Sequence, residues 1–300
     1  MLTPKLVTMT KRGWLLIGAL GLIWGTPYLF IRIAVEEISP SMVVFSRLLM
    51  GSLILLPLAF KQGQGGVIKT HRAGILTFAL IEMAIPFGVL GVAEQRISSS
   101  LTALLIASVP IVNAIITHRM GLDQHWNLKR ISGLLIGLVC VSLLVGFEIR
   151  ADNWWSVAIV GFAILGYSLG PVIISQMLSD VPSIGIMAWS QFMGMAFYAP
   201  IVGYEFMNDS WKYVDQISAD TIISVVGLGL LCTVLAFILL FKAVDEVGPS
   251  RITIITYINP AVAVILGIVI LSEEITPTML LAFPTILIGS ILAASKPKVS

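Results

Sequence analysis

Two similar stretches decide the fold: IASVPIVNAI, from Ile106 to Ile115, and TYINPAVAVI, from Thr256 to Ile265. Their prolines, Pro110 and Pro260, are separated by half the length of the chain. Each proline lies inside an apolar run, where it removes one backbone hydrogen bond and frees the carbonyl four residues earlier. We therefore predict a kink or hinge at the same place in two related halves of the chain.

The composition around these stretches is that of a membrane protein. Hydrophobic residues make up 57% of the chain and charged residues 11%, against about 25% charged residues in an ordinary soluble domain. Apolar runs long enough for membrane-spanning helices recur along the whole length. The sequence predicts an all-α membrane protein with ten transmembrane helices of about twenty residues each, near 14–35, 42–60, 74–93, 101–118, 131–147, 154–175, 184–204, 221–241, 252–271 and 279–295.

The basic residues between these spans lie mostly on one side of the predicted membrane. Lys and Arg collect in cytoplasmic loops, so we expect both termini to be cytoplasmic. The loops on the opposite side hold only Arg96, Arg150 and Lys212. The chain is therefore expected to be a multi-pass protein of a bacterial-type inner (plasma) membrane.

Other residues recur at or near the spacing of the two prolines. Each half, residues 1–148 and residues 149–300, would hold five spans, and because five is odd the second half enters the membrane in the opposite sense. Such an inverted repeat is common among secondary transporters, whose substrate sites lie near the bilayer midplane. The recurring pairs are Ala93 and Ala243, Ser100 and Ser250, Asp123 and Glu273, Pro40-Ser41 and Pro182-Ser183, and Gly25 and Gly166.

Several motifs together resemble the drug/metabolite transporter superfamily, in its ten-helix EamA-like branch. The resemblance implies ten helices in two inverted halves and the export of small organic metabolites, with amino acids as frequent substrates. The second half departs from the first, because it lacks the tryptophan-glycine pair and has Trp189 in place of Arg47. The matching residues are Trp24-Gly25, Arg47, Ala93-Glu94-Gln95-Arg96-Ile97-Ser98, Ala107-Ser108-Val109-Pro110-Ile111 and the acidic loops after the fourth and ninth spans.

Two charged residues, Arg47 and Glu82, lie within predicted spans and away from the last turn, where a charge is costly and by default suggests a function. Glu82, in the middle of the third span, either faces a cavity and binds a substrate ammonium or a coupling proton, or is a protonated or paired residue between helices. Arg47, in the outer third of the second span, either ties helices together through backbone carbonyls or Glu82, or captures a substrate carboxylate. If both residues face one cavity, they would bind the two charged groups of an amino acid.

Aromatic and neutral polar side chains lie at depths that suit the lining of a small-molecule pocket. Trp24 and Tyr28 share one face of the first span by their i, i+4 spacing. The alternative for aromatic residues is an anchoring belt at the membrane interface. The candidate substrate-binding residues are Trp24, Tyr28, Arg47, Glu82, Asn113, Tyr167, Trp189, Tyr257 and Asn259, and the candidate kink residues are Pro86, Pro110 and Pro260.

An enzyme is not expected. The run Gly166-Tyr167-Ser168-Leu169-Gly170 fits the G-x-S-x-G pattern of hydrolases, but Ser168 lies within a predicted span and the histidines lie in inner loops or at inner span ends. The sequence has no G-x-x-x-x-G-K-[ST] loop for ATP, and its histidines lack metal-ligand spacing. We expect no cofactor, metal or nucleic acid; the expected partners are a small-molecule substrate and the lipid bilayer, with the monomer as the working unit.

These observations predict a secondary active transporter that exports small organic metabolites by alternating access around a central cavity. The resemblance favours amino acids, in particular aromatic or other apolar ones. The alternatives are an exporter of sugars, nucleotide-sugars or toxic cations with the same fold, and a facilitative, channel-like carrier.

Overall fold

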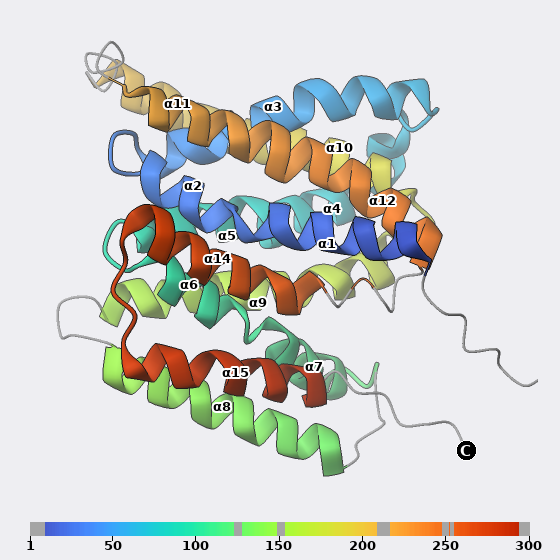
Figure 1. Cartoon of the computed structure of the whole chain (residues 1–300). Coiled ribbons are helices and arrows are strands. Elements are labelled where there is room, and N and C mark those ends of the chain that lie inside the picture. The colour runs from blue at the N-terminus through green and yellow to red at the C-terminus, as the bar shows by residue number, and fades with distance from the viewer. Residues whose placement is uncertain are drawn as a thin grey trace, which may run out of the picture.

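The computed structural model describes residues 10–122, 128–148, 154–208, 217–247, 252 and 255–293. Within these ranges every regular element is a helix and no strand occurs. The helices run roughly alongside one another in a single bundle (Figure 1). The prediction of an all-helical membrane protein is therefore confirmed.

The helices of the first half follow the expected spans, some of them in two or three pieces. They are α1 (Lys11–Gly25) and α2 (Pro27–Ala34); α3 (Pro40–Lys61); α4 (Val67–Phe78), the π-helix η1 (Ala79–Ala84) and α5 (Ile85–Glu94); α6 (Ser99–Ile106) and α7 (Val109–Arg119); and α8 (Leu128–Glu148).

The second half has helices in the same order. They are α9 (Trp154–Met177); α10 (Ser183–Met207); α11 (Ala219–Val226), the π-helix η3 (Gly227–Leu235) and α12 (Ala236–Val247); α14 (Ile255–Leu271); and α15 (Pro277–Ala293). A π-helix is rare and often marks a functional place, and here one occurs in the third expected span of each half.

By length and composition, six helical segments of the described residues are able to cross a membrane. Two shorter apolar helices, Ile255–Leu271 and Pro277–Leu292, follow near the end of the chain. The count of ten spans and the inverted orientation of the halves stay predictions. The six segments are Lys11–Ala34, Pro40–Lys61, Val67–Glu94, Ser99–Arg119, Trp154–Met177 and Ala219–Val247.

Pro110 and Pro260 lie in different backbone surroundings. At Pro110 the chain is broken into α6 and α7, and the proline lies in the first turn of α7, where its missing N–H costs no helical hydrogen bond. Pro260 lies inside α14, which continues past it. Pro86 lies at the start of α5, directly after η1. A hinge role for any of the three stays a prediction.

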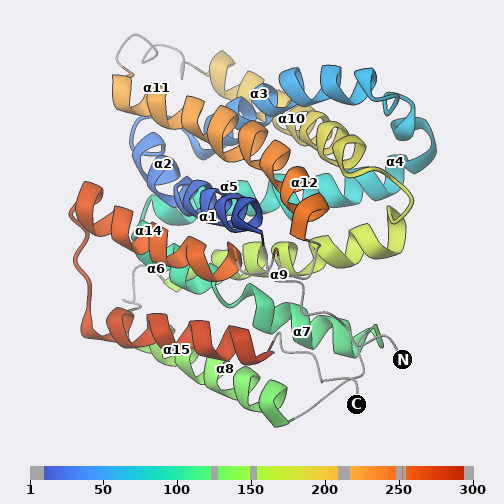
Figure 2. The same cartoon turned by 45° about the vertical axis from the view of Figure 1, so that its right-hand side comes forward.

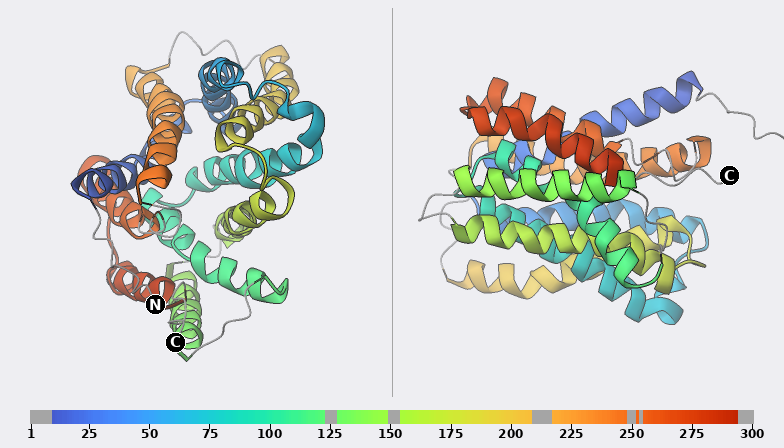
Figure 3. Two further views of the ribbon diagram at one scale, coloured as in Figure 1. Left: turned by 90° about the vertical axis from the view of Figure 1, so that its right-hand side faces the viewer. Right: turned by 90° about the horizontal axis from the view of Figure 1, so that it is seen from below.

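The main helix contacts join the first half of the chain to the second. Helix α3 packs against α10, α8 against α15, α5 against α9, and α1 against α14 and α12. Figures 1 and 2 show α8 and α15 side by side along one edge of the bundle. The view along the helices in Figure 3 shows helices of both halves alternating around the bundle. The interface between the halves therefore runs through the interior, where a shared site would lie.

The bundle has two ends, which we name by a residue at each. The Glu273 end holds the loops 35–39, 95–98 and 272–276 and the start of α11, and the His71 end holds the start of α1 and the loops 62–66 and 178–182. In Figure 1 the Glu273 end is on the left and the His71 end on the right.

Candidate functional site

Arg47 is the buried cation at the centre of the candidate site. Its side chain comes from α3 and is only 7% exposed. Its Nε donates a hydrogen bond to Thr233 Oγ1 at 2.9 Å, and its Cζ lies 3.8 Å from the centroid of the Phe87 ring, a cation–π contact. No hydrogen bond joins its two terminal amino groups to another described residue. The expected tie to Glu82 is absent among the described residues, and Thr233 takes that place.

Thr233 holds Arg47 because of the π-helix in which it lies. Its hydroxyl donates to the carbonyl of Leu228 at 2.9 Å, five residues earlier, and accepts from Arg47. The hydroxyl therefore acts as a donor to the backbone of η3 and as an acceptor for the guanidinium, which fixes the position of Arg47. Thr233 was not among the residues predicted from the sequence, because the wider turn of η3 that positions it has no signature in the sequence.

Aromatic side chains from three segments surround this cation. Tyr28 of α2 and Tyr167 of α9 lie near Arg47. Trp24 of α1 donates from Nε1 to the carbonyl of Cys232 at 3.2 Å, and its ring meets that of Phe237 edge-on at 6.2 Å. The structure thus brings Trp24, Tyr28, Arg47 and Tyr167 to one interior region, and their role in binding a substrate stays a prediction.

Glu82 enters the same interior from η1. Its Oε2 is buried and has no hydrogen-bond partner among the described residues. The carboxylate lies against Gly170 of α9, where any side chain would collide with it. Tyr167 is close enough to interact electrostatically with both Glu82 and Arg47. Among the described residues Glu82 has no paired partner, and whether it binds substrate or is a protonated residue between helices stays open.

The small-residue patterns are used within the chain. Gly166 lies against the carbonyl of Ile81 and the ring of Pro86, so α9 and the third span approach closely. Gly21 and Gly25 of α1 likewise lie against side chains of α14. Ser168, the serine of the hydrolase-like pattern, donates to the backbone carbonyl of Ile164 at 2.6 Å.

Four other candidates lie outside the Arg47 group or are engaged between helices. Asn113 donates to the carbonyl of Ser168 at 2.6 Å. Asn259, with its amide turned to donate, bonds the carbonyls of Gly21 at 3.0 Å and Ile255 at 2.9 Å. Trp189 donates to the carbonyl of Gln64 at the His71 end, 3.3 Å away, and Tyr257 is half-buried in the first turns of α14. A direct role of these four in binding substrate stays a prediction.

Two buried polar residues were missed as site residues. Glu94, the last residue of α5, is 0% exposed, and neither carboxylate oxygen has a partner among the described residues. Gln191 of α10 is also 0% exposed with an unpartnered amide, and it lies against Gly51 beside the methyl group of Thr233. A glutamate at the end of a predicted span suggests a surface position, and this is why the sequence analysis did not select Glu94.

At the Glu273 end, carboxylates contact helix N-termini of the opposite half. Glu273 accepts hydrogen bonds from the backbone N–H groups of Ser99 (2.7 Å) and Ser100 (3.0 Å) and from the Ser100 hydroxyl (2.5 Å), at the start of α6. Glu205 accepts from the hydroxyls of Ser39, at 2.7 Å, and Ser41 at the start of α3. Asp123 and Ser250, which the repeat would place in the corresponding contact, lie outside the described residues.

A third contact at this end involves Glu37. The backbone N–H of Ser218, at the start of α11, donates to Glu37 at 2.8 Å. This hydrogen bond, together with those of the Thr221 and Ser218 side chains, lowers the pKa of Glu37 from its usual 4.5. Three carboxylates therefore join the two halves at the Glu273 end, each at the N-terminus of a helix, where negative charge is favourable.

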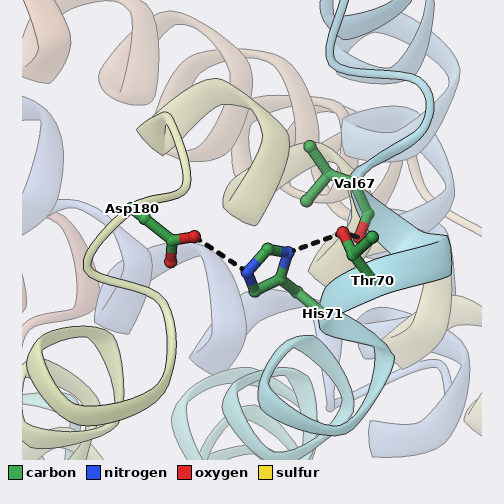
Figure 4. A network of polar contacts seen from close by, with 4 residues as sticks. All are labelled: Val67, Thr70, His71 and Asp180. Atoms are coloured by element: carbon green, nitrogen blue, oxygen red, sulfur yellow. Dashed lines mark hydrogen bonds and ion pairs between the residues drawn. The ribbon is translucent and has the colours of Figure 1, made fainter.

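The links at the His71 end are more exposed. His71 Nε2 lies 3.2 Å from Asp180, while its Nδ1 lies 2.8 Å from the Thr70 hydroxyl, which donates onward to the carbonyl of Val67 (Figure 4). The side chain of Asp180 is 72% exposed. Glu246 accepts from the Thr10 hydroxyl at 2.7 Å and lies 3.8 Å from Arg12.

Comparisons with known proteins agree with this architecture. The profile of the EamA-like transporter family matches residues 11–147 and again residues 150–295, on either side of the boundary expected after residue 148. A crystal structure of a protein has the same fold, with a TM-score of 0.64 at 14% identity, covering 94% of this chain and 96% of that one.

Curated relatives cover nearly the whole chain. The "Uncharacterized transporter YdfC" of Bacillus subtilis (strain 168) is 28% identical over 268 residues, which are 86% of this chain and 82% of that protein. The "Uncharacterized inner membrane transporter YedA" of Escherichia coli (strain K12) is 25% identical over 275 residues, which are 91% of this chain and 88% of that protein. The resemblance found in the sequence is confirmed: this membrane protein belongs to the EamA-like transporter family.

Proposed function

We propose that this chain is a secondary active transporter that exports small organic metabolites bearing a carboxylate, with aromatic or other apolar amino acids as the favoured class. The observation that carries the proposal is the Arg47 guanidinium. It is held deep between the two halves by Thr233 and Phe87, and its terminal amino groups are not engaged by any described residue.

A buried cation without a neighbouring anion is unfavourable, so a guanidinium in this position favours an anionic ligand. The planar fork of an arginine suits a carboxylate, which it binds through two parallel hydrogen bonds. Because Nε is already bound to Thr233, the two terminal amino groups are the donors that remain for this role.

The neighbours of Arg47 supply the other features that an amino acid requires. The unpartnered Glu82 carboxylate offers an anion for the ammonium group. Tyr28, Tyr167 and Trp24 offer aromatic surface for an apolar side chain, as in most small-molecule pockets. Glu82 alone would also suit a toxic cation, and this is the second candidate class.

Alternating access would come from exchanging the contacts at the two ends of the bundle. By the distribution of basic residues, the Glu273 end faces outward and the His71 end faces the cytoplasm of an inner membrane. We assign the chain ten spans in two inverted halves, which rock against each other around the Arg47 region. The monomer is the proposed working unit, because the glycine pairs are used within the chain.

Uptake of a radiolabelled amino-acid panel into proteoliposomes tests the proposal. We expect saturable uptake of aromatic and other apolar amino acids. Arg47→Lys, which keeps the charge but loses the fork, should lower kcat/KM by about tenfold or more. Arg72→Gln is the matched control, because Arg72 is an exposed arginine and its change should leave uptake unaltered.

Three outcomes would contradict the proposal. Folded wild-type protein that takes up organic cations and no amino acid would favour the second class. Equal loss of uptake in Arg47→Lys and Arg72→Gln would remove Arg47 from the site. Uptake that rises linearly with substrate concentration, without saturation, would indicate a channel-like carrier.

A further inference from the structure

We propose that Glu94 is a proton-binding site, and that a proton bound there is required for the Glu273 end to close. This inference rests on the proposed function only in calling the proton the coupling ion. The binding of the proton and the closure are properties of the chain itself.

The side chain of Glu94 is completely enclosed by the protein. Its side chain is 0% exposed, and both carboxylate oxygens are buried without a hydrogen-bond partner among the described residues. An ionised carboxylate is very costly to bury without donors, so such a group takes up a proton instead. This arrangement of the helices is therefore one in which Glu94 carries a proton.

A second carboxylate, that of Glu273, lies near Glu94. Glu273 comes from the loop after α14, in the opposite half, and interacts electrostatically with Glu94. It accepts three hydrogen bonds at the start of α6, and backbone N–H donors at a helix N-terminus favour a charged carboxylate. The two neighbouring carboxylates therefore differ in surroundings: Glu273 accepts three hydrogen bonds, and Glu94 accepts none from the described residues.

The other charged and titratable groups near Glu94 do not compensate for a negative charge on its carboxylate. Arg32 of α2 interacts favourably with it, but that guanidinium donates to the Glu94 backbone carbonyl and lies 3.5 Å from the carboxylate of Glu36. Tyr28 and Tyr167 interact electrostatically with Glu94 from the interior side. No described residue donates a hydrogen bond to the Glu94 carboxylate.

Loss of the proton must therefore open the enclosure. An ionised Glu94 would face the charge of Glu273 without a hydrogen-bond donor, and the simplest relief is the entry of water as Glu273 leaves the start of α6. The proton comes from water at the Glu273 end while that end is open. If that end faces outward, external protons close the outer gate; in an exporter driven by proton entry, the proton would then leave to the cytoplasmic side before the outer gate reopens.

Hydrogen–deuterium exchange of the α6 N-terminus tests this directly, without any substrate. The amides of Ser99 and Ser100 report the contact, because they donate to Glu273. After correction for the intrinsic pH dependence of exchange, we expect their protection to fall about tenfold as the pH is raised, the value of roughly one charged hydrogen bond.

Three variants sharpen the test. Glu94→Gln cannot ionise, so protection should stay at its low-pH level throughout. Glu82→Gln is the control, since Glu82 is a half-buried glutamate of the same Val67–Glu94 segment whose Oε2 also lacks a described partner, and it should retain the wild-type pH dependence of this substrate-free measurement. Glu273→Gln loses the charge at the start of α6, so protection should be weak at every pH.

The inference is overturned if wild-type protection at Ser99 and Ser100 does not change with pH, a result that needs no variant. It is overturned equally if Glu94→Gln keeps the wild-type pH dependence, or if Glu82→Gln alone abolishes it. A failure of amino-acid uptake with pH-dependent protection intact would count against the proposed substrate and leave the proton site standing.

Discussion

The two ends of the bundle are joined by different kinds of contact. At the Glu273 end, carboxylates of Glu273, Glu205 and Glu37 each meet the N-terminus of a helix from the other half. At the His71 end, the histidine meets an aspartate whose side chain is 72% exposed. Hydrogen bonds to charged groups contribute about 1.5–3 kcal/mol when shielded from water, whereas exposed ion pairs contribute about 0–1 kcal/mol.

The difference between these contacts indicates which end of the bundle opens at the lower cost in free energy. In the present arrangement the Glu273 end is held by three carboxylates at helix N-termini, whereas at the His71 end one carboxylate, Glu246, meets the N-terminus of α1 beside the exposed His71–Asp180 contact. We infer that the interior opens more readily toward the His71 end, the side that the basic residues assign to the cytoplasm. An exporter must take up its substrate from that side.

The largest expected effect comes from breaking the Glu273 contact. Glu273→Ala removes the acceptor of three hydrogen bonds and should lower the free energy of unfolding by about 3 kcal/mol. Thermal unfolding in detergent measures it. The control is Glu274→Ala, since Glu274 is the exposed neighbouring glutamate; similar destabilisation by both would mean that the contact at α6 contributes little.

A smaller effect is expected from the His71–Asp180 contact. A double-mutant cycle with His71→Gln and Asp180→Asn should give a coupling energy below about 1 kcal/mol, because the pair is exposed to water. The same unfolding assay measures it. A coupling energy as large as the Glu273 effect would erase the difference between the two ends.

The smallest effect concerns Glu37, which is fully exposed. Because the folded state lowers the pKa of Glu37, its contribution to stability is present above the usual value of 4.5 and is lost as the pH falls through the folded value. Wild type should therefore exceed Glu37→Gln in melting temperature at neutral pH, and the gap should close in acid. An equal gap at both pH values would show that the contact with Ser218 acts through something other than the charge.

Part of the candidate site could be predicted from the sequence. Arg47 and Glu82 stand out because a charge within an apolar run is conspicuous, and both are in fact interior. Trp24, Tyr28 and Tyr167 were selected by depth; Tyr28 and Tyr167 lie near Arg47, and Trp24 bonds the carbonyl of Cys232, next to Thr233. Asn113 was selected by the same reasoning, yet its amide bonds the backbone of α9.

The sequence by itself determined the class of protein, the helices and the family, because apolar runs of membrane length and a few spaced motifs are local features. Only the tertiary structure decided which polar groups lack a partner. Depth along a helix can be read from position in the chain, but the direction in which a side chain points depends on how helices pack. The buried Glu94 beside Glu273 and the Thr233 that holds Arg47 are products of that packing, since each contact joins residues from opposite halves of the chain.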